Sequence, residues 1–523
     1  MTEKRAALVL LPIFLWSVLG YVVVWPWMHE IDRAEPEFSI LAHINAGIWW
    51  VVLLWTFHHL SFQLGALARI SRFLPQAGVP NEPPTIAILY MTCDDFDEEA
   101  CLSCLNQDYD HVKLYICDDS RSSLFIERIQ RFVEAYPSCE RIVRRDRKGF
   151  KAGNINHALR HHVRTEWFLL VDADQRLPGN FVSLLRAVIP SNGRDAPLFI
   201  QGAHSAFPAK DCTAFQSALG PEVELFYQRD LVLRERFGFV PLLGHGALIQ
   251  RKACLDLGGF PEVVSEDFAF ALRAARVGKR GTYVPHVESW EAYPHDLGAF
   301  LTRLNKFSGG SAELIRKELG PFFLSPVSWV EKWDFTMAMA WYVLMPCLLV
   351  NGFLSAYVVH ILWRGELNYL HPWLPYLYTW LLIALVGLCV SVTRTGKQAV
   401  RFFFWSTAVY TAALPVCSWA FTKHLFLSPK FERTPKGREP TTVRFHELVL
   451  AGCFGVLALA LAMSWWSPFS PILLGQGVAF LSLGLYMRLS SMSSLGRLAR
   501  LLVYLPGFLY LTGLYAVWAW AKA

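Results

Sequence analysis

The chain has 523 residues, of which 54% are hydrophobic and 18% are charged. Soluble domains carry about 25% charged residues, so this composition excludes a protein that is soluble along its whole length. The net charge of +6 comes mostly from Lys and Arg beside apolar segments, and it therefore gives no support to nucleic-acid binding.

Charge-free apolar runs predict the membrane segments, because a helix needs about 20 apolar residues to cross a bilayer. The run 448–487 contains Pro468 and Pro471 near its middle, so we expect two spans joined by a tight turn. The first run shows no evident cleavage site and is expected to remain as an anchor. The runs are 6–28, 38–57, 335–363, 367–393, 402–422, 448–487 and 501–521.

The orientation of these spans follows from the Lys and Arg residues in the short loops. Lys4 and Arg5 place the N-terminus inside, the acidic loop 29–37 lies outside, and the segment after the second span is cytoplasmic. The run 402–422 has basic residues on both sides, so it is expected to lie in the membrane plane or to form a re-entrant helix. We therefore expect seven spans and one interfacial helix.

Residues 82–320 have the composition of a soluble domain and alternate between strand and helix patterns, which predicts a parallel α/β sheet. Predicted strands cover 85–90, 112–116, 142–143 and 167–171, and predicted helices cover 98–107, 125–136, 157–163 and 268–277. The last of these strands is a short apolar run that stops abruptly at two carboxylates, Asp172 and Asp174.

Three of the predicted strands are followed by pairs of acids, which are Asp94 and Asp95, Asp118 and Asp119, and Asp172 and Asp174. If the strands are neighbours, the acids line one edge of the sheet, where open α/β sheets bind ligands. Solvated turns explain one such pair but explain three poorly. We therefore expect a nucleotide site, with Mg²⁺ or Mn²⁺ between carboxylates and a diphosphate.

Two further groups of residues are candidates for this site. Lys151, beside an expected turn at Gly153, suits a phosphate, although a surface lysine is an equal alternative. Glu266 and Asp267 precede a predicted helix, where acids also favour the helix dipole, and one of them is a candidate general base. His245 is a further candidate. No P-loop or dinucleotide-binding motif is present.

Together these motifs resemble the membrane-integrated family-2 glycosyltransferases, the cellulose, chitin and hyaluronan synthases. The resemblance runs from about residue 85 to 437. It rests on Cys117-Asp-Asp-Ser120, Lys151-Ala-Gly-Asn154, Asp172-Ala-Asp174, Ser265-Glu-Asp267 and Phe431-Glu-Arg-Thr434-Pro-Lys436-Gly, the last being similar to a gating loop. It implies an α/β GT-A-like (Rossmann-like) cytoplasmic domain at 82–320. This domain would follow two transmembrane helices at 1–81. The remaining segment, 321–523, would contain interfacial helices, a gating-like loop at 426–441 and further spans.

The resemblance also implies roles for these residues. Asp94, Asp118, Asp119, Lys151 and Asp172 would bind the nucleotide sugar, Asp172 and Asp174 the metal, and Asp267 would be the catalytic base. Glu266 and His245 would lie at the acceptor, and Phe431, Thr434 and Lys436 would belong to the gating loop.

One segment departs from the family pattern. Where relatives carry Gln-X-X-Arg-Trp at the channel mouth, this chain has Arg303-Leu-Asn-Lys306-Phe307. A cation and an aromatic ring remain, so Phe307 is expected to stack on an acceptor sugar and Arg303 or Lys306 to meet the diphosphate. The loss of the Gln and Trp leaves sugar, linkage and processivity open.

The implied activity is metal-dependent, inverting transfer of a hexose from a nucleotide sugar, for which a UDP-sugar is favoured. The implied acceptor is a growing glycan, of cellulose-like or β-glucan type, which would be exported across the membrane. One alternative is a single transfer to a polyprenyl phosphate or another lipid. Another is a transporter or scaffold with a degenerate nucleotide domain. The expected location is a bacterial inner membrane, with room for accessory subunits.

Overall fold

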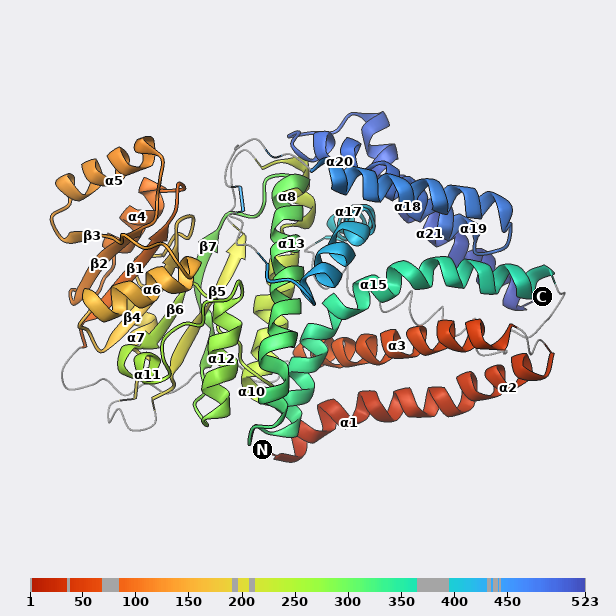
Figure 1. The fold of residues 1–523 in the computed structure, drawn as a ribbon, viewed down its shortest axis with the longest axis horizontal. Coiled ribbons are helices and arrows are strands. Elements are labelled where there is room, and N and C mark those ends of the chain that lie inside the picture. The colour runs from red at the N-terminus through yellow and green to blue at the C-terminus, as the bar shows by residue number, and fades with distance from the viewer. Residues whose placement is uncertain are drawn as a thin grey trace.

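The computed structural model describes residues 2–34, 38–67, 84–190, 196–206, 212–364, 395–429, 434–435, 441 and 444–522. A mixed α/β domain occupies one end of the molecule and a layer of long helices the other (Figure 1). Helix α13 (Leu297–Leu314) lies between the two parts, and it carries the segment that departs from the family pattern.

The α/β domain is built on one sheet of seven strands in the order β3-β2-β1-β4-β6-β5-β7. The four predicted strands are all present. The strands are β1 (Ile86–Thr92), β2 (Val112–Asp118), β3 (Cys139–Val143), β4 (Trp167–Asp172), β5 (Phe199–Ala206), β6 (Ala247–Gln250) and β7 (Thr282–Glu291).

The α/β prediction is confirmed, but the expectation of a parallel sheet is wrong. Strands β3, β2, β1 and β4 are parallel, whereas β6 runs antiparallel to both of its neighbours, β4 and β5. Gly246 begins this reversal, because its N–H donates to the carbonyl of Leu170 in β4 at 2.7 Å. Strand β6 was not predicted because the whole strand, Ala247–Gln250, is only four residues long.

Helices cover both faces of the sheet, which explains why β1 is buried along its whole length. Alternate residues of β1 point to opposite faces. Ile86, Ile88 and Tyr90 pack with α4 (Glu98–Leu105), α5 (Ser123–Ala135) and α7 (Phe181–Arg186). Ala87, Leu89 and Met91 belong to the other core, which includes α6 (Phe150–His161) and α12 (Glu266–Arg276).

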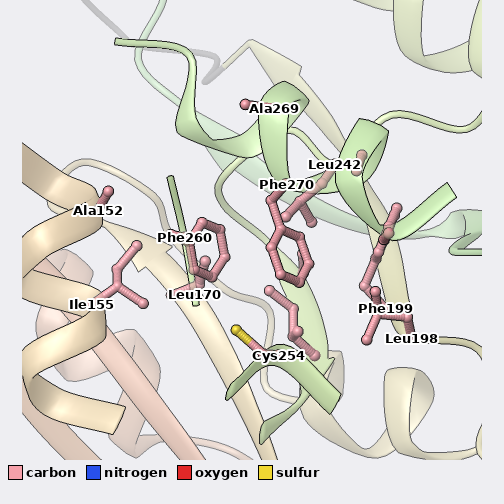
Figure 2. Close-up of a cluster of buried hydrophobic side chains, with 14 of the residues drawn as sticks. Ala152, Ile155, Leu170, Leu198, Phe199, Leu242, Cys254, Phe260, Ala269 and Phe270 are labelled. Carbon is pink, nitrogen blue, oxygen red and sulfur yellow. The ribbon is translucent and has the colours of Figure 1, made fainter. Parts of the chain in front are cut away.

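Figure 2 shows part of this second core, where the rings of Phe260 and Phe270 stack with their centroids 4.7 Å apart. Burying an aromatic side chain of this size contributes about 2–3 kcal/mol. The stacked pair fixes the start of α12, which carries Glu266 and Asp267, against α6, which carries Lys151. The packing of the core thus determines the distance between two groups of candidate site residues.

The predicted turn at Gly153 is wrong, because Gly153 lies inside α6. The helix begins at Phe150, after Gly149 has taken a left-handed conformation with φ of 73°. A side chain at Gly153 would collide with the carbonyl of Lys148 and with the guanidinium of Arg144. The glycine is therefore needed for close packing rather than for a turn.

Six helices in the described part of the chain are long and apolar enough to cross a membrane. They cover Leu10–Arg33, Ser39–Ser61, Trp329–Arg364, Gly396–His424, Phe445–Ser464 and Arg497–Trp520. A bent pair, α19 (Ser470–Leu481) and α20 (Leu483–Ser490), follows α18 (Phe445–Ser464), so the predicted break within 448–487 is present. The predicted span 367–393 lies outside the described residues.

Helix α17 (Gly396–His424) contains the run 402–422, for which we predicted an orientation in the membrane plane. It is seen nearly end-on in Figure 1, whereas α3 (Ser39–Leu67), α15 (Trp329–Arg364) and α18 run across the picture. It packs on α13, which belongs to the α/β side, through residues such as Phe300, Trp405 and Val409. The in-plane orientation stays a prediction.

Candidate active site

The three acid pairs follow strands that are neighbours in the sheet, as the nucleotide-site hypothesis requires. Strand β1 lies between β2 and β4, with Thr92 beside Asp118 and Met91 beside Asp172. Because these strands are parallel, their carboxyl ends share one edge. The candidate acids are therefore gathered at the place where α/β sheets bind ligands.

Asp94 links two of the loops at this edge. Its carboxylate accepts hydrogen bonds from the backbone N–H groups of Arg121 and Ser122, both at 2.8 Å. Its own N–H donates to Ser120 Oγ at 3.0 Å, and its φ of 58° is in the left-handed region. Asp94 thus shapes the loop after β2, which is the loop expected to meet the nucleotide.

Asp118 and Asp119 each form a two-point ion pair with an arginine that the sequence analysis did not single out. Asp118 Oδ2 accepts from Arg141 Nε and Nη2 at 3.0 and 2.7 Å, and the side chain of Asp118 is buried. Asp119 accepts from Arg144 Nε and Nη2 at 2.9 and 2.7 Å. A carboxylate has about four acceptor positions. Asp118 also accepts from the N–H of Ser120 at 2.7 Å, so it keeps about one acceptor position and Asp119 about two, while the arginines fix the orientation of both.

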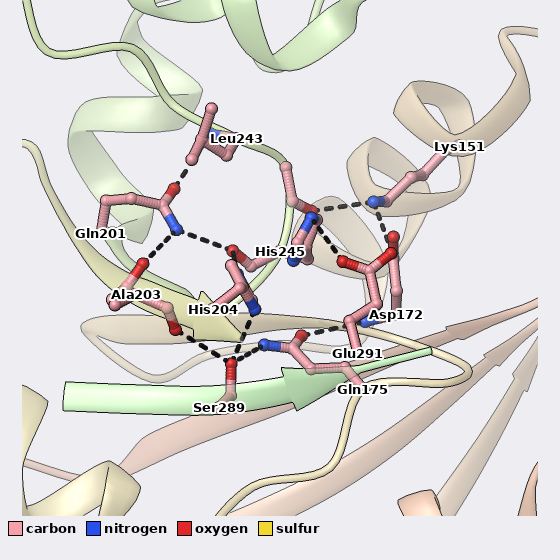
Figure 3. A network of polar contacts seen from close by, with 12 residues as sticks. Lys151, Asp172, Gln175, Gln201, Ala203, His204, Leu243, His245, Ser289 and Glu291 are labelled. Atoms are coloured by element: carbon pink, nitrogen blue, oxygen red, sulfur yellow. Dashed lines mark hydrogen bonds and ion pairs between the residues drawn. The ribbon is translucent and has the colours of Figure 1, made fainter. Parts of the chain in front are cut away.

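Lys151 lies in the first turn of α6 and reaches two parts of the site. Its Nζ donates to Asp172 Oδ1 at 2.6 Å and to the carbonyl of Gly244 at 2.8 Å (Figure 3). Burial lowers the pKa of Lys151, but the charges of Asp172 and Glu266 outweigh it and raise that pKa above its usual value. Lys151 is therefore a charged ammonium group beside the carboxylates at the end of β4.

Asp172 and Asp174 provide oxygen donors one residue apart, at the end of a buried strand. Such a donor set fits Mg²⁺ or Mn²⁺. The Lys151 ammonium already binds Asp172, which shows that the position favours a cation. Asp172 and Asp174 thus fit the expected metal, and the ammonium group of Lys151 lies beside Asp172.

Glu266 and Asp267 form the first turn of α12, after Ser265. Asp267 lies against the loop before β6, since a side chain at Gly244 would approach its Oδ2 to 2.9 Å. Gly244 has a φ of 76°, so glycine is favoured there for its conformation as well as for space. The candidate base and Lys151 therefore touch the same glycine from two directions.

Burial raises the pKa of both acids. For Glu266, burial and then the neighbouring charge of Asp267 raise the pKa to about 7. The nearby ammonium groups of Lys151 and Lys306 act in the opposite direction on both. A carboxylate whose pKa is raised towards neutral pH is a stronger base than an ordinary one, which suits proton abstraction.

Replacing Glu266 by Gln tests this environment. Because the folded pKa of Glu266, about 7, lies above its ordinary value of 4.5, its protonation stabilises the fold below pH 4.5. That stabilisation is lost as pH rises through 7. We therefore expect Glu266→Gln to gain thermal stability relative to wild type between pH 5 and 8, measured by unfolding in detergent without added metal. A difference in thermal stability between Glu266→Gln and wild type that stays constant with pH would contradict the raised pKa of Glu266.

His245 lies between these groups. Burial lowers its pKa, while the charges of Asp172, Asp174 and Asp267 act to raise it. Its ring contacts that of His204, with centroids 4.0 Å apart, and its Nε2 is 3.6 Å from Glu291 Oε2.

Sequence reasoning missed a polar network behind this histidine, formed by Gln175, Gln201, His204, Ser289 and Glu291 (Figure 3). Gln175 Nε2 donates to Ser289 Oγ at 2.8 Å, and Ser289 Oγ lies 2.8 Å from His204 Nδ1. No local motif marks these residues, because they come from three separate places in the chain, which are the turn after β4, strand β5 and strand β7. An unexpected polar residue within an apolar strand, such as His204 in β5, was the available signal.

The segment Arg303–Phe307 of α13 presents its cations in two directions. Arg303 Nη2 donates to Glu222 Oε1 at 2.9 Å, and its guanidinium lies 4.8 Å from the centre of the Tyr293 ring. Lys306 lies close enough to Glu266 and Asp267 to influence their pKa values. Arg303 is thus engaged with Glu222, and Lys306 is the cation that faces the candidate base. Phe307 is exposed.

Glu222 also accepts hydrogen bonds from the hydroxyls of Tyr293 and Tyr410, both at 2.7 Å. Tyr410 belongs to α17, so this cluster joins the α/β domain to the helical layer. Of the predicted gating residues, Phe431 and Lys436 lie outside the described residues and Thr434 is half-buried. The segment just before them is held by Arg316, which donates to the carbonyl of Phe426 and to Ser428 Oγ.

Comparison with solved structures finds similar chains at low scores. A mannosyltransferase from Pyrobaculum calidifontis in complex with GDP-Man and Mn²⁺ has a TM-score of 0.40 and 20% identity, covering 74% of this chain and 96% of that one. The S. aureus protein TarS in complex with UDP-GlcNAc has a TM-score of 0.35 and 13% identity, over 65% and 88%.

Sequence comparison finds relatives among polysaccharide synthases. The chain is 31% identical over 221 residues to the cellulose synthase 1 catalytic subunit [UDP-forming] of Komagataeibacter xylinus, covering 40% of this chain and 28% of that protein. It is 25% identical to a probable glucomannan 4-beta-mannosyltransferase of Oryza sativa, over 40% and 37% of the two chains. The chain thus spans well under half the length of both.

A probable glycosyltransferase of Sulfolobus acidocaldarius matches more extensively, at 22% identity over 68% of this chain and 78% of that protein. Residues 167–393 match the family described as glycosyl transferase family group 2. That match begins at β4 and includes Asp172, Asp174, Glu266 and Asp267. Residues 167–393 are therefore similar in sequence to the family-2 glycosyltransferases, and the chain is similar to cellulose synthases and glucomannan mannosyltransferases over part of its length.

Proposed function

We propose that this chain transfers a hexose from a nucleotide sugar, a UDP-sugar in the first instance, to the end of a growing glycan and passes the product across the membrane. The observation that supports this most is the convergence of Lys151, Asp172 and Asp267 around Gly244. In this proposal the groups that would bind the diphosphate and the base that would activate the acceptor meet at one loop at the edge of the sheet.

In this proposal Asp118 and Asp119, held by their arginines, orient the nucleotide. Asp172 and Asp174 would hold Mg²⁺ or Mn²⁺, an ion that would supply positive charge against the diphosphate. Asp267 accepts the proton of the acceptor hydroxyl, whose oxygen bonds to the anomeric carbon from the side opposite the diphosphate. The bond from that carbon to the diphosphate oxygen breaks, its electrons leave with the nucleoside diphosphate, and Lys151 stabilises the charge that forms.

Passage of a glycan is supported by polar groups between the two parts of the molecule. Glu222, Arg303, Tyr293 and Tyr410 form a partly buried polar and aromatic cluster where α13 meets α17. Polar side chains also meet inside the helical layer, where Asn45 Nδ2 donates to Asn351 Oδ1 and to Ser355 Oγ. Polar groups at membrane depth are costly and usually functional.

A second candidate function is single transfer to a polyprenyl phosphate or another lipid acceptor. The Arg303–Glu222 ion pair favours it, because it fills a position where the synthases carry Gln. A transporter or scaffold is disfavoured, because all the acids expected of an enzyme are present at one edge of the sheet.

The two enzymatic candidates differ in their products. Purified protein is incubated with a panel of UDP-sugars and GDP-mannose, with Mg²⁺ or Mn²⁺, and both nucleoside diphosphate release and product size are measured. We expect release with a polymeric product. A product of one sugar on lipid would favour the second candidate, and absence of release with every donor would contradict both.

Membrane topology provides a separate prediction. If α17 lies in the membrane plane, cysteines introduced near Lys397 and near Lys436 should both be shielded from an impermeant thiol reagent applied outside the cell. A cysteine at Asp32, in the loop expected outside, provides the positive control. Labelling near Lys436 alone would show that α17 crosses the membrane.

A further inference from the structure

His204, His245 and Glu291 place three metal-binding side chains together behind the carboxylate site. One atom from each residue lies within 4.8 Å of the others, and this is the one such group of three or more His, Cys, Asp or Glu in the described residues. They come from β5, from the loop before β6 and from the end of β7. We propose that they form a second metal site, for a transition ion of the Zn²⁺ type, separate from the Mg²⁺ or Mn²⁺ site.

The donor atoms suit this class of ion. Two imidazoles and one carboxylate are ligands for Zn²⁺, whereas Mg²⁺ prefers oxygen alone. His245 Nε2 and Glu291 Oε2 are 3.6 Å apart. Two ligands on a tetrahedral ion with bonds of about 2.1 Å are separated by roughly 3.4 Å, so this pair needs only a small adjustment. His245 Nδ1 is buried and has no hydrogen-bond partner, so His245 has a ring nitrogen available on either side.

His204 has the outer support that metal-bound histidines usually show. Ser289 Oγ lies 2.8 Å from His204 Nδ1, accepts from Gln175 Nε2 at 2.8 Å, and lies 3.3 Å from the carbonyl of Ala203 (Figure 3). When the Ser289 hydroxyl donates to Ala203, its oxygen accepts from His204 Nδ1–H. His204 Nε2 then carries a lone pair, 3.4 Å from the carbonyl oxygen of His245. In the other tautomer Nε2–H donates to that carbonyl, so an ion bound at Nε2 would select the tautomer that carries its proton on Nδ1.

The charge around the cluster also favours a cation. Three carboxylates, Asp172, Asp174 and Asp267, act electrostatically on His245, against one ammonium group, that of Lys151. Because His245 directly follows Gly244, an ion bound here would fix the loop whose carbonyl holds Lys151. The ion would thus act on the architecture of the site, by joining β5, β7 and this loop.

The test uses full-length protein purified with a tag that contains no histidine, treated with chelator and transferred to buffer saturated with Mg²⁺. Zn²⁺ is titrated calorimetrically, and Co²⁺ is used as a visible-absorption probe. We expect one Zn²⁺ per chain at this site, and a Co²⁺ spectrum with nitrogen ligation. Glu291→Gln and His204→Ala should each weaken binding by at least about tenfold.

Glu291→Gln is the more informative variant, because Glu291 is 38% exposed and its replacement leaves the core intact. His111→Ala, at an exposed position just before β2, is the matched control and should bind as wild type does. Asp174→Asn should lose sugar transfer but keep Zn²⁺, so failure of this proposal is distinct from failure of the proposed function. Equal Zn²⁺ binding by wild type and Glu291→Gln, or no binding by wild type, would overturn the proposal.

Discussion

Asp174→Asn is expected to reduce sugar transfer by about 10³-fold or more while the protein still folds and inserts. The substitution removes one of two carboxylate ligands and one negative charge from the end of β4. A metal ion that neutralises a leaving diphosphate stabilises the transition state by several kcal/mol. Each 1.36 kcal/mol of activation free energy changes the rate by about a factor of ten. The fold should survive, because the ion pair between Lys151 and Asp172 does not involve this residue.

Two measurements separate metal binding from turnover. Mn²⁺ affinity is measured by electron paramagnetic resonance, and turnover by release of the nucleoside diphosphate. Asp146→Asn, at an exposed loop position, removes the same charge elsewhere in the domain and should change neither. Full activity of Asp174→Asn, or of wild type in excess EDTA, would exclude the metal assignment.

Local patterns were sufficient to predict the part of the site that follows the strands. The run before Asp172 is apolar, short and ended by acids, and the structure has β4 at Trp167–Asp172. The same reasoning found β1 and β2 and placed their acids at one edge, because parallel neighbours share the direction of their carboxyl ends. These features depend on residues close together in the sequence.

Contacts between distant segments were not predictable in this way. Arg141 and Arg144 belong to β3 and the loop after it, and nothing in their spacing shows that they meet Asp118 and Asp119. Gly153 suggested a turn beside Lys151, but the left-handed conformation belongs to Gly149, and Gly153 serves close packing within α6. A glycine in the sequence does not reveal which of these two reasons applies.

The antiparallel strand β6 had the largest consequence among the missed elements. It follows Gly244, His245 and Gly246, and both glycines have positive φ values. That geometry brings Gly244 between Lys151 and Asp267. The sequence showed all three residues, but their meeting at one loop depends on how β6 inserts between β4 and β5.

Asp267→Asn is expected to reduce sugar transfer by about 10²–10⁴-fold, the usual contribution of a positioned general base. Asparagine keeps the size of the side chain and its contact with Gly244, but it has no basic oxygen at neutral pH. Donor affinity should change little, because the residues proposed to hold the diphosphate are Lys151, Asp172 and Asp174. The prediction is therefore a loss of turnover at nearly constant affinity for the nucleotide sugar.

Affinity for the UDP-sugar is measured by calorimetry, and turnover is measured by release of the nucleoside diphosphate. Asp256→Asn is the matched control, because Asp256 is exposed at the end of α11 (Arg251–Asp256). Asp267 is preferred over Glu266 because successive residues of a helix point in different directions, so only one is expected to face the acceptor. The contact with Gly244 identifies Asp267 as the one beside the diphosphate site. If Asp267→Asn binds donor normally and turns over within about threefold of wild type, which is far below the contribution of a base, Asp267 is not the base. Glu266, whose pKa is raised to about 7, and His245 then become the groups to replace next.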